Sequence, residues 1–353
     1  MSKAQTQRTR ASGRVTLAEV AARAGVGTMT ASRAISQPEM VSPALRARVG
    51  QAVAELGYVP NRAARALASA RSKVIVVLVP SLSNAVFTDV LAGIQDALEP
   101  DGYQILIGNT RYSDAEEEKL LNTYLQSSPD GILLSGLTHS RQVTELLASS
   151  KLPIVSMMDL AGAPDGQPAA SSTTTAGMSV GFSQLQAGYT MTRYLLDKGY
   201  KRIGFMGAQR DERTLKRLEG YRRALQEAGS YDPRLETMVA DPSTIALGAE
   251  LLGRMLSSTP DCDAIFCCND DLAQGAIFQC QRRGIAVPRQ LAICGFNDLP
   301  VSAWMNPSVT TIATPRYRVG FEAAQLLRAV IRGETPAATR IDLGFTLMAR
   351  ESA

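Results

Sequence analysis

The sequence LAEVAARAGVGTMTASRAI, residues 17–35, decides the fold of the N-terminal part of the chain. Leu17, Val20 and Ala21 share one apolar helix face, and the run from Thr16 to Glu19 has the pattern of a capping box. Gly25-Val26-Gly27 ends this helix, and residues 28–35 begin a second one. Two short helices joined by a glycine turn are typical of a helix-turn-helix, whose second helix enters the DNA major groove. A helical hairpin inside an ordinary core would have the same pattern.

Positive charge gathers on the same part of the chain. Residues 1–72 contain 11 Lys and Arg against 3 Asp and Glu, a net charge of +8, whereas residues 73–353 carry a net charge of −4. A basic head on an acidic body fits binding to DNA phosphates, although a charge run is often only a solvated surface.

The N-terminal part divides into three predicted segments. We predict a flexible basic tail over 1–14, a helix-turn-helix domain over 15–59, and a hinge helix or linker over 60–72. The domain gains a third helix that starts at Ser42-Pro43 and ends at Gly57, because Ser caps helices and Pro suits their first turn.

Residues 73–353 have a different sequence pattern, in which short apolar runs alternate with amphipathic helices. The predicted strands are 74–80, 104–108, 131–136, 153–158, 202–208, 264–270 and 291–296, each with a helix after it, and a further strand over 341–349. Near-continuous apolar runs are typical of buried parallel strands. This segment is too long to fold around a single hydrophobic core, so we predict two α/β lobes. Residues 162–177, poor in apolar side chains, are a lobe boundary or a surface loop.

Several classes of protein are not expected. No apolar run approaches the length of a membrane span, and residues 1–14 lack the apolar centre of a secretory signal, so we expect a cytoplasmic protein without a membrane partner. The five cysteines form no C-x-x-C pair, which favours buried free thiols over a metal site. Residues 177–181 match G-x-S-x-G, but the single histidine, His139, precedes Ser179, against the order of that motif. Neither an enzyme nor a cofactor is expected.

The chain resembles the LacI/GalR family of bacterial transcription regulators over almost its whole length. The motifs that carry the resemblance are the strand–helix alternation and the segments 15–35, 57–69, 266–276 (FCCNDDLAQGA), 292–300 (AICGFNDLP) and 306–312 (NPSVTTI). Segments 80–87, 138–140, 207–221 and 342–347 are similar to repressors of gluconate use in particular. The resemblance implies an all-α helix-turn-helix head and a two-lobed α/β body with parallel sheets, like periplasmic binding proteins.

The resemblance also implies a set of DNA contacts. Thr28, Met29 and Arg33 would reach base edges, and Thr30 and Ser32 would bind phosphates. By the resemblance Leu67 would enter the minor groove as a wedge, whereas the residue pattern alone would make it plain helix filler. Thr16, Asn61, Arg62 and Ala64 complete the predicted set. Paired hinge helices imply a dimer on a palindromic operator. Because no apolar heptad repeat follows residues 341–349, we expect a dimer and not a tetramer.

A small-molecule effector is expected in the cleft between the lobes, where the carboxyl ends of parallel strands meet. The predicted contacts are Ser81, Asn84, Phe87, Asn109, Arg111, His139, Asp159, Arg213, Arg217, Asn269 and Asn297, with Lys216 as a further cation. Asn297 stands where the family commonly has Asp, so the cleft loses an anion.

This charge pattern favours an anionic sugar acid, namely gluconate, phosphogluconate or ketogluconate, that releases the operator. A neutral sugar effector, or a ligand that acts as co-repressor, remains the alternative. A transport-type binding protein would share the lobes but not the basic head.

Overall fold

The computed structural model describes residues 15–60, 71–161 and 177–353, which form two compact units, 1–72 and 73–353. The predicted tail over 1–14 and most of the predicted hinge lie outside the described residues. The same holds for the proposed DNA contacts Asn61, Arg62, Ala64 and Leu67.

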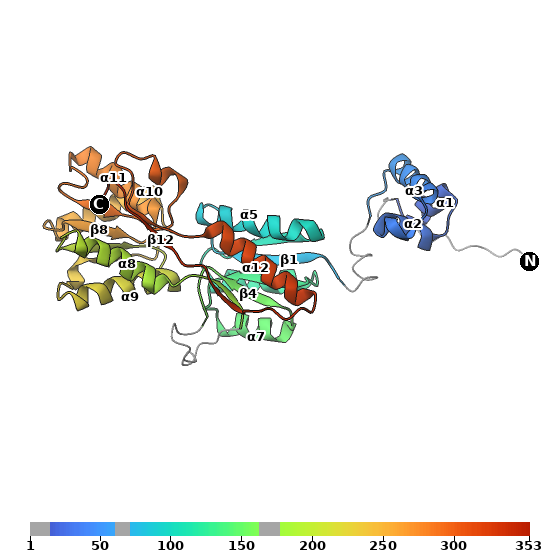
Figure 1. Ribbon diagram of the computed structural model, residues 1–353, viewed down its shortest axis with the longest axis horizontal. Helices are drawn as coiled ribbons and strands as arrows, with labels where there is room; N and C mark the ends of the chain where they lie inside the picture. Colours follow the sequence, from blue (N-terminus) through green and yellow to red (C-terminus); the bar gives the residue numbers. More distant parts are fainter. Residues whose placement is uncertain (1–14, 61–70, 162–176) are drawn as a thin grey trace, which may run out of the picture. The chain divides into compact units, whose positions relative to one another are not determined.

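The first unit contains the predicted helix-turn-helix (Figure 1). Its elements are α1 (Leu17–Ala24), α2 (Thr28–Ser36), the 3-10 helix η1 (Pro38–Met40) and α3 (Pro43–Leu56). The capping box is confirmed, since Thr16 Oγ1 accepts from Glu19 N–H at 3.3 Å and Glu19 Oε2 accepts from Thr16 N–H at 2.8 Å. Gly25 closes α1 in the left-handed region, with φ 64°. Small side chains such as Val20, Ala31 and Val49 form the core of the three helices.

The N-lobe, the lobe of the second unit that begins at residue 73, is built on a six-stranded parallel sheet in the order β11-β5-β4-β3-β1-β2. Its strands are β1 (Val74–Val79), β2 (Gln104–Asn109), β3 (Gly131–Ser135), β4 (Ile154–Met157), β5 (Ser179–Gly181) and β11 (Arg340–Asp342). Its helices are α5 (Val86–Leu98), η2 (Glu99–Asp101), α6 (Asp114–Leu125), α7 (Arg141–Ser150) and α12 (Arg316–Ile331).

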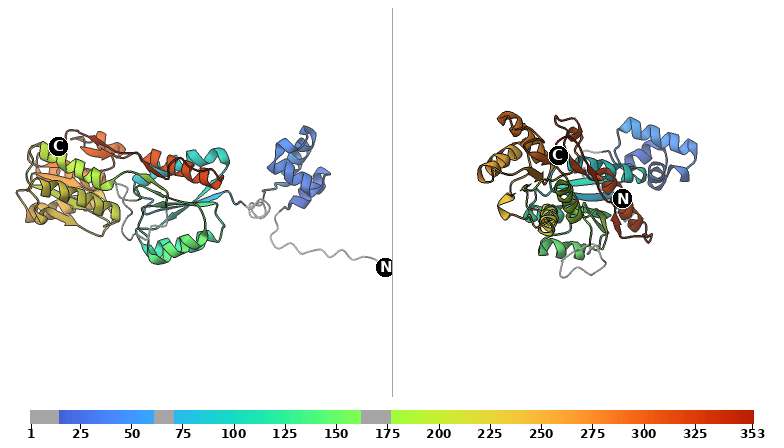
Figure 2. Two further views of the ribbon diagram at one scale, coloured as in Figure 1. Left: turned by 60° about the horizontal axis from the view of Figure 1, so that its bottom comes forward. Right: turned by 60° about the vertical axis from the view of Figure 1, so that its left-hand side comes forward.

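The apolar run of β1 is buried on both faces, as a central parallel strand requires. Ile75, Val77 and Val79 pack with α5 and α12, whereas Val76 and Leu78 pack with α6 and α7. Figures 1 and 2 show α5 and α12 side by side on one face of this sheet and α7 on the other.

The C-lobe is built around a four-stranded parallel sheet in the order β7-β6-β8-β9, and β10 and β12 form an antiparallel pair beside it. Its strands are β6 (Ile203–Gly207), β7 (Glu236–Met238), β8 (Ala264–Cys267), β9 (Ala292–Cys294), β10 (Thr311–Ala313) and β12 (Thr346–Met348). Its helices are α8 (Gln184–Asp197), α9 (Glu212–Glu227), η3 (Pro233–Leu235), α10 (Ile245–Ser258), α11 (Asp270–Arg283) and η4 (Pro300–Ala303). All five cysteines lie buried and free in this lobe, as predicted.

The structure corrects the predicted strand over 341–349. This segment contains two strands in different lobes, because β11 pairs with β5 in the N-lobe and β12 pairs with β10 in the C-lobe. Gly344 separates them with a φ of 65°, and its N–H donates to Asp342 Oδ1 at 3.0 Å. The described chain therefore crosses between the lobes three times, after β5, after β10 and after β11.

Two of the predicted helices are not found in the described residues. The first described helix after β4 is α8, which belongs to the other lobe, and β9 is followed by the short η4 and by β10 before α12 begins. Ser179, in the G-x-S-x-G match, lies fully buried within β5 and not at a strand-to-helix turn.

Three helix pairs cross at glycines, and one of these crossings supports the cleft. The pairs are α5 with α12, α8 with α9, and α10 with α11. A Cβ on Gly188 of α8 would lie 2.3 Å from the backbone oxygen of Arg217 on α9, and one on Gly220 would lie 2.1 Å from that of Leu185. This close approach fixes the position of Arg217 against α8.

Candidate functional site

One face of α2 carries exposed polar side chains. Thr28, Met29, Ser32 and Arg33 are exposed, Met29 by 68% of its surface, while Ala31 and Ala34 are buried against the other helices. Thr30 is half-buried. Within the described residues, no side chain pairs with the guanidinium of Arg33. A helix with this spacing presents one free surface to a groove while its other face holds it in place.

Most other described cations of this unit are engaged within it. Arg23 pairs with Glu55 at 2.5 Å, Arg46 donates to the Pro38 carbonyl at 2.6 Å, and Arg48 donates to the Ala24 carbonyl at the end of α1 at 2.6 Å. Thr16 is exposed, but its hydroxyl is used in the capping box. Among the described residues, fewer cations are therefore free near α2 than the composition alone indicates.

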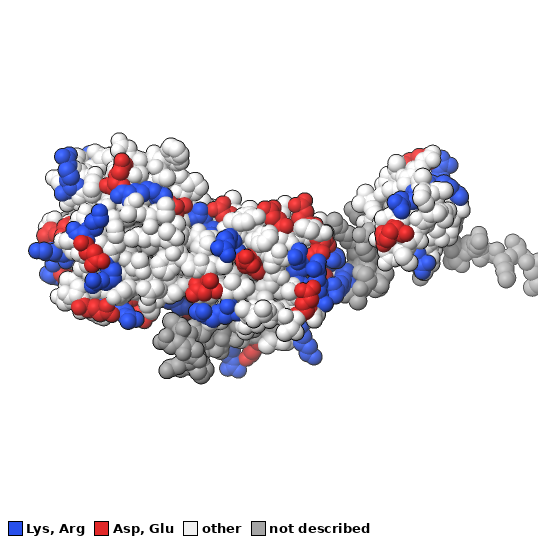
Figure 3. Space-filling model, in the orientation of Figure 1, with Lys and Arg blue, Asp and Glu red and all other residues white. Residues whose placement is uncertain are grey.

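The second unit has a cavity of about 500 Å³ between its two lobes. Its lining residues follow strands β1, β2, β3 and β6, at their carboxyl ends, and include Pro80, Thr110, Tyr112, Ser113, Asp114, Glu117, Ser135, Gly136, Leu137, Thr138, Gln209, Arg210, Asp211, Glu212, Arg213 and Leu215. Four carboxylates and two guanidinium groups therefore face the cavity. Figure 3 shows cations beside anions on both lobes, so charge alone does not single out the cavity.

Arg213 is the buried cation of the cavity wall. Its guanidinium pairs with Asp211 at 2.5 Å, donates to Ser135 Oγ of the N-lobe at 2.9 Å, and lies 5.7 Å from the ring centre of Phe87. Burial alone would raise the pKa of Asp211, but the charge of Arg213 and the Thr214 N–H outweigh burial and lower it to about 2. Arg213 thus has a carboxylate partner within the protein.

Arg217, one turn further along α9, has a different environment. It donates to Gln184 Oε1 at 2.8 Å, to the Cys268 carbonyl at 2.6 Å and to Asn269 Oδ1 at 3.0 Å. Its guanidinium lies 3.8 Å from the ring centre of Phe296. Only 5% of the residue is exposed, and burial lowers its pKa to about 10. No described carboxylate bonds to this cation.

Asn269 and Asn297 continue this network. Asn297 Nδ2 donates to Asn269 Oδ1 at 3.0 Å, and both residues are buried. The structure thus brings together Arg217, Asn269 and Asn297, three of the predicted effector contacts, from α9 and from the ends of β8 and β9.

A second group joins the lobes through Asp159. Lys216 Nζ of α9 lies 2.6 Å from Asp159 Oδ2 of the N-lobe and 3.0 Å from Glu212 Oε1. Glu212 also accepts from Thr138 Oγ1 of the N-lobe. Burial raises the pKa of Asp159 although Lys216 opposes it. In this structure the two lobes are in direct polar contact.

Comparison with known proteins identifies the family. Residues 16–61 match the model of bacterial regulatory proteins of the lacI family, and residues 72–350 match the model of periplasmic binding proteins and the sugar binding domain of the LacI family. The chain belongs to the LacI family.

Relatives of this LacI-family chain are regulators. The HTH-type transcriptional regulator GntR of Pseudomonas aeruginosa is 48% identical over 345 residues, 98% of this chain and 97% of that protein. GntR of Escherichia coli is 38% identical over 95% of this chain and 97% of its own length. The crystal structure of transcription regulator GntR from Chromobacterium violaceum is 50% identical, covers 79% of this chain and 98% of its own, and has a TM-score of 0.74. The chain is thus a LacI-family transcriptional regulator.

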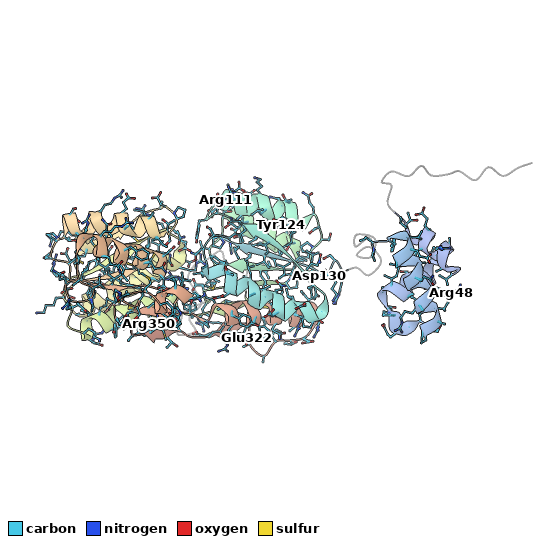
Figure 4. All side chains as sticks on the ribbon, turned by 90° about the horizontal axis from the view of Figure 1, so that it is seen from above. Arg48, Arg111, Tyr124, Asp130, Glu322 and Arg350 are labelled. Carbon is cyan, nitrogen blue, oxygen red and sulfur yellow. The ribbon has the colours of Figure 1, made fainter. Side chains whose placement is uncertain are left out.

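The other predicted effector contacts of the LacI-family body lie outside the Arg217 network. Ser81 Oγ accepts from Asn84 N–H at 3.1 Å and Asn84 Oδ1 accepts from Val86 N–H at 3.0 Å, so both serve the turn before α5. Asn109 Oδ1 accepts from the Arg111 N–H at 3.2 Å. Arg111 is exposed, at the edge of the N-lobe (Figure 4), and Tyr112 beside it lines the cavity. His139 is buried with Nδ1 3.0 Å from Glu117 Oε1.

Sequence reasoning missed several residues of the cleft. Tyr112, Thr138, Gln209 and Glu212 line the cavity, and Gln184 bonds to Arg217. The polar segment 207–221 and the strand ends indicated the neighbourhood of some of these residues. No pattern in the sequence pointed to Gln184, because it reaches Arg217 across 33 residues.

No metal site and no membrane helix is found in the parts of the chain that the structure describes. No three His, Cys, Asp or Glu side chains are grouped to hold an ion. None of the described helices combines the length and apolarity needed to span a bilayer.

Proposed function

We propose that this LacI-family regulator is a repressor that binds a palindromic operator as a dimer and is released by a small sugar acid, namely gluconate, phosphogluconate or ketogluconate. In this role it would control sugar-acid catabolism. The similarity to regulators named GntR supports the proposal.

The observation that carries the effector class is the environment of Arg217. This guanidinium is buried, yet its hydrogen-bond partners, Gln184, the Cys268 carbonyl and Asn269, are all neutral. A buried charge without a counter-ion is costly, and a ligand carboxylate would compensate it with short charge-assisted hydrogen bonds. Arg213, by contrast, is already neutralised by Asp211.

The remaining groups suit the polyol part of a sugar acid. The cavity offers the carboxylates of Asp114, Glu117 and Glu212 as acceptors and the hydroxyls of Tyr112 and Thr138 as donors or acceptors. Ionised carboxylates accept hydrogen bonds from hydroxyl groups but repel another anion. Arg217 lies one turn of α9 beyond Arg213 of the cavity wall and is itself buried. The proposed ligand would reach this guanidinium with its anion and leave its hydroxyls among the carboxylates that line the cavity.

Thermal melting of the full chain tests the effector class. A ligand that binds only the folded protein raises its melting temperature. We expect D-gluconate, 6-phosphogluconate or 2-ketogluconate to raise it at millimolar concentration and D-glucose not to. The Arg217→Met variant should lose the response, whereas Arg111→Met, which removes an exposed cation outside the network, should keep it. A rise with glucose alone would exclude the anionic effector.

DNA binding rests on the exposed face of α2. Selection of binders from random duplexes, followed by mobility shifts, is expected to yield palindromic sites whose affinity falls steeply with salt. Addition of the sugar acid should release the DNA. Tighter binding would make the ligand a co-repressor, and binding without sequence preference would exclude operator recognition.

Exposed apolar side chains on α11 and around η4 support the dimer. Trp304, Val301 and Phe278 are exposed by 89%, 49% and 41%. Gln281 Nε2 of α11 donates to the Asn306 carbonyl at 2.6 Å, which joins the helix to the loop that carries Trp304. Large exposed apolar side chains that lie together mark interfaces. Sedimentation is expected to give a dimer for the full chain and a monomer for Trp304→Glu, while a stable tetramer would contradict the proposal.

A further inference from the structure

The loop after β9, which carries Asn297 to the Arg217 network, has a strained backbone. Asn297 has a φ of 106° and Asp298 a φ of 53°, and neither is glycine. Residues in this left-handed region cost energy and persist only where their surroundings hold them. The position of the Asn297 carboxamide, bonded to Asn269 at 3.0 Å, therefore depends on what holds this loop.

The N–H groups of Asn297 and Asp298 donate to the Ile312 carbonyl and to Thr311 Oγ1 of β10. Groups from three further elements also hold the loop in place. Arg350, after β12 (Figure 4), pairs with Asp298 at 2.7 Å. Asp270 of α11 accepts from the Leu299 N–H at 2.6 Å. The guanidinium of Arg316, the first residue of α12, donates to the Asn297 carbonyl and to the Asp298 carbonyl, the latter at 3.4 Å. Arg350 and Asp270 belong to the C-lobe, whereas α12 belongs to the N-lobe.

Arg316 is bound at its other edge by helix α5. Its Nε lies 2.9 Å and its Nη2 2.8 Å from Asp89 Oδ2. Only 9% of Arg316 is exposed, and it directly follows the chain crossing after β10. One guanidinium thus joins the Asn297 loop of the C-lobe to α5 of the N-lobe, whose first turn also places Phe87 next to Arg213.

We propose that Arg316 is a positioning residue for the effector cleft, which holds the strained Asn297 loop in its binding geometry while Asp89 orients the guanidinium. This inference rests on the proposed function for its ligand but not for its geometry. This role requires a planar guanidinium with several donors, because Arg316 must bond two carbonyls and a carboxylate at once. A lysine ammonium is a point charge and cannot reach all three.

Hydrogen exchange without any effector tests the geometry. In Arg316→Gln, amides of residues 296–302 are expected to exchange about tenfold faster than in the wild type, with a smaller increase in Asp89→Asn. Arg318→Gln, which removes an exposed cation two residues further along α12, should leave this segment unchanged. Unchanged exchange in Arg316→Gln would overturn the proposal whatever the ligand is.

Calorimetry with D-gluconate tests the consequence for binding. We expect Arg316→Gln to weaken gluconate binding about tenfold and Asp89→Asn about threefold, and the double variant to be no weaker than Arg316→Gln alone, since both act through one contact. Compared with Arg316→Gln, the Arg316→Lys variant should have a melting temperature closer to that of the wild type but the same weakened affinity for gluconate. Full recovery of affinity by lysine, or additive losses in the double variant, would overturn the positioning role.

The two proposals fail in different ways. If the wild type binds no sugar acid while Arg316→Gln still speeds exchange over 296–302, the proposed effector is wrong and the positioning contact stands. If gluconate binds the wild type and Arg316→Gln equally, the positioning role is wrong and the effector stands.

Discussion

The exposed face of α2 and the buried Arg217 network present opposite kinds of surface to the ligands proposed for them. In α2, Arg33 and its neighbours are exposed, and no described side chain bonds the Arg33 guanidinium. In the cleft, Arg217, Asn269 and Asn297 are buried and bonded to one another. Substitutions on α2 should therefore change binding with little change in stability, whereas substitutions in the cleft should change both.

The largest expected effect concerns the support of the cleft. Gly188→Ala would place a Cβ 2.3 Å from the Arg217 carbonyl oxygen, so α8 and α9 must move apart. We expect a loss of about 3 kcal/mol in the free energy of unfolding and loss of the sugar-acid response. Chemical denaturation followed by circular dichroism measures the first. Gly50→Ala in α3, where nothing lies within 4 Å, is the control and should stabilise slightly. An equal change in the free energy of unfolding for Gly188→Ala and Gly50→Ala would contradict the proposed role of the α8–α9 crossing.

The next effect is a dependence of the free energy of unfolding on pH. It arises in the cleft and not in α2, because α2 contains no acidic residue. The folded pKa of Asp211 is about 2 against 3.8 for the free group, so the unfolded chain binds the proton more tightly. The stability that Asp211 contributes, about 2 kcal/mol, is present above pH 4 and is lost as the pH falls through 2. Denaturation of wild type and Asp211→Asn from pH 5 to 2 should show their difference shrinking.

Asp270 provides a control of opposite sign for that measurement. Burial raises its pKa to about 6, so its contribution falls as the pH rises from about 4 to 6. Asp270→Asn should remove this loss of stability between pH 4 and 6 and leave the loss that Asp211 causes at lower pH unchanged. If Asp211→Asn and wild type keep a constant difference down to pH 2, the pairing with Arg213 does not perturb Asp211.

A smaller free energy, confined to binding, is expected from Arg33. Arg33→Ala should weaken binding to the selected operator about tenfold, the lower part of what one base contact contributes. Its melting temperature should stay close to that of the wild type, since the side chain is exposed. Mobility shifts and thermal melts measure both. Arg23→Ala removes the same charge from a residue paired with Glu55 and should affect operator affinity less.

The smallest effect concerns the start of α2. Gly27 caps this helix with φ −71° and no side-chain acceptor, and a Cβ there would meet nothing within 4 Å. Gly27→Ser should stabilise the helix by about a few tenths of a kcal/mol, because its hydroxyl can accept from an N–H of the first turn. Hydrogen exchange of the first α2 amides measures this. Gly27→Ala, without an acceptor, should not slow exchange.

The sequence by itself determined what depends on local spacing. The three helices of the head, seven strands of the two lobes, the buried free cysteines and the LacI family all follow from periodicity, caps and motifs within short segments. The exposed face of α2 was predictable because a 3.6-residue period and the small residues Ala31 and Ala34 decide which side faces the core.

Only the tertiary structure decided the pairing within the cleft. The sequence does not distinguish the three arginines 111, 213 and 217. In the structure Arg111 is exposed, Arg213 is neutralised by Asp211, and Arg217 bonds only to neutral acceptors. The division of residues 341–349 between two sheets, and the bond of Arg316 to Asp89 across 227 residues, are likewise absent from any local pattern. The physical reason is that the charge state and position of a buried side chain depend on partners that chain crossings bring from distant segments.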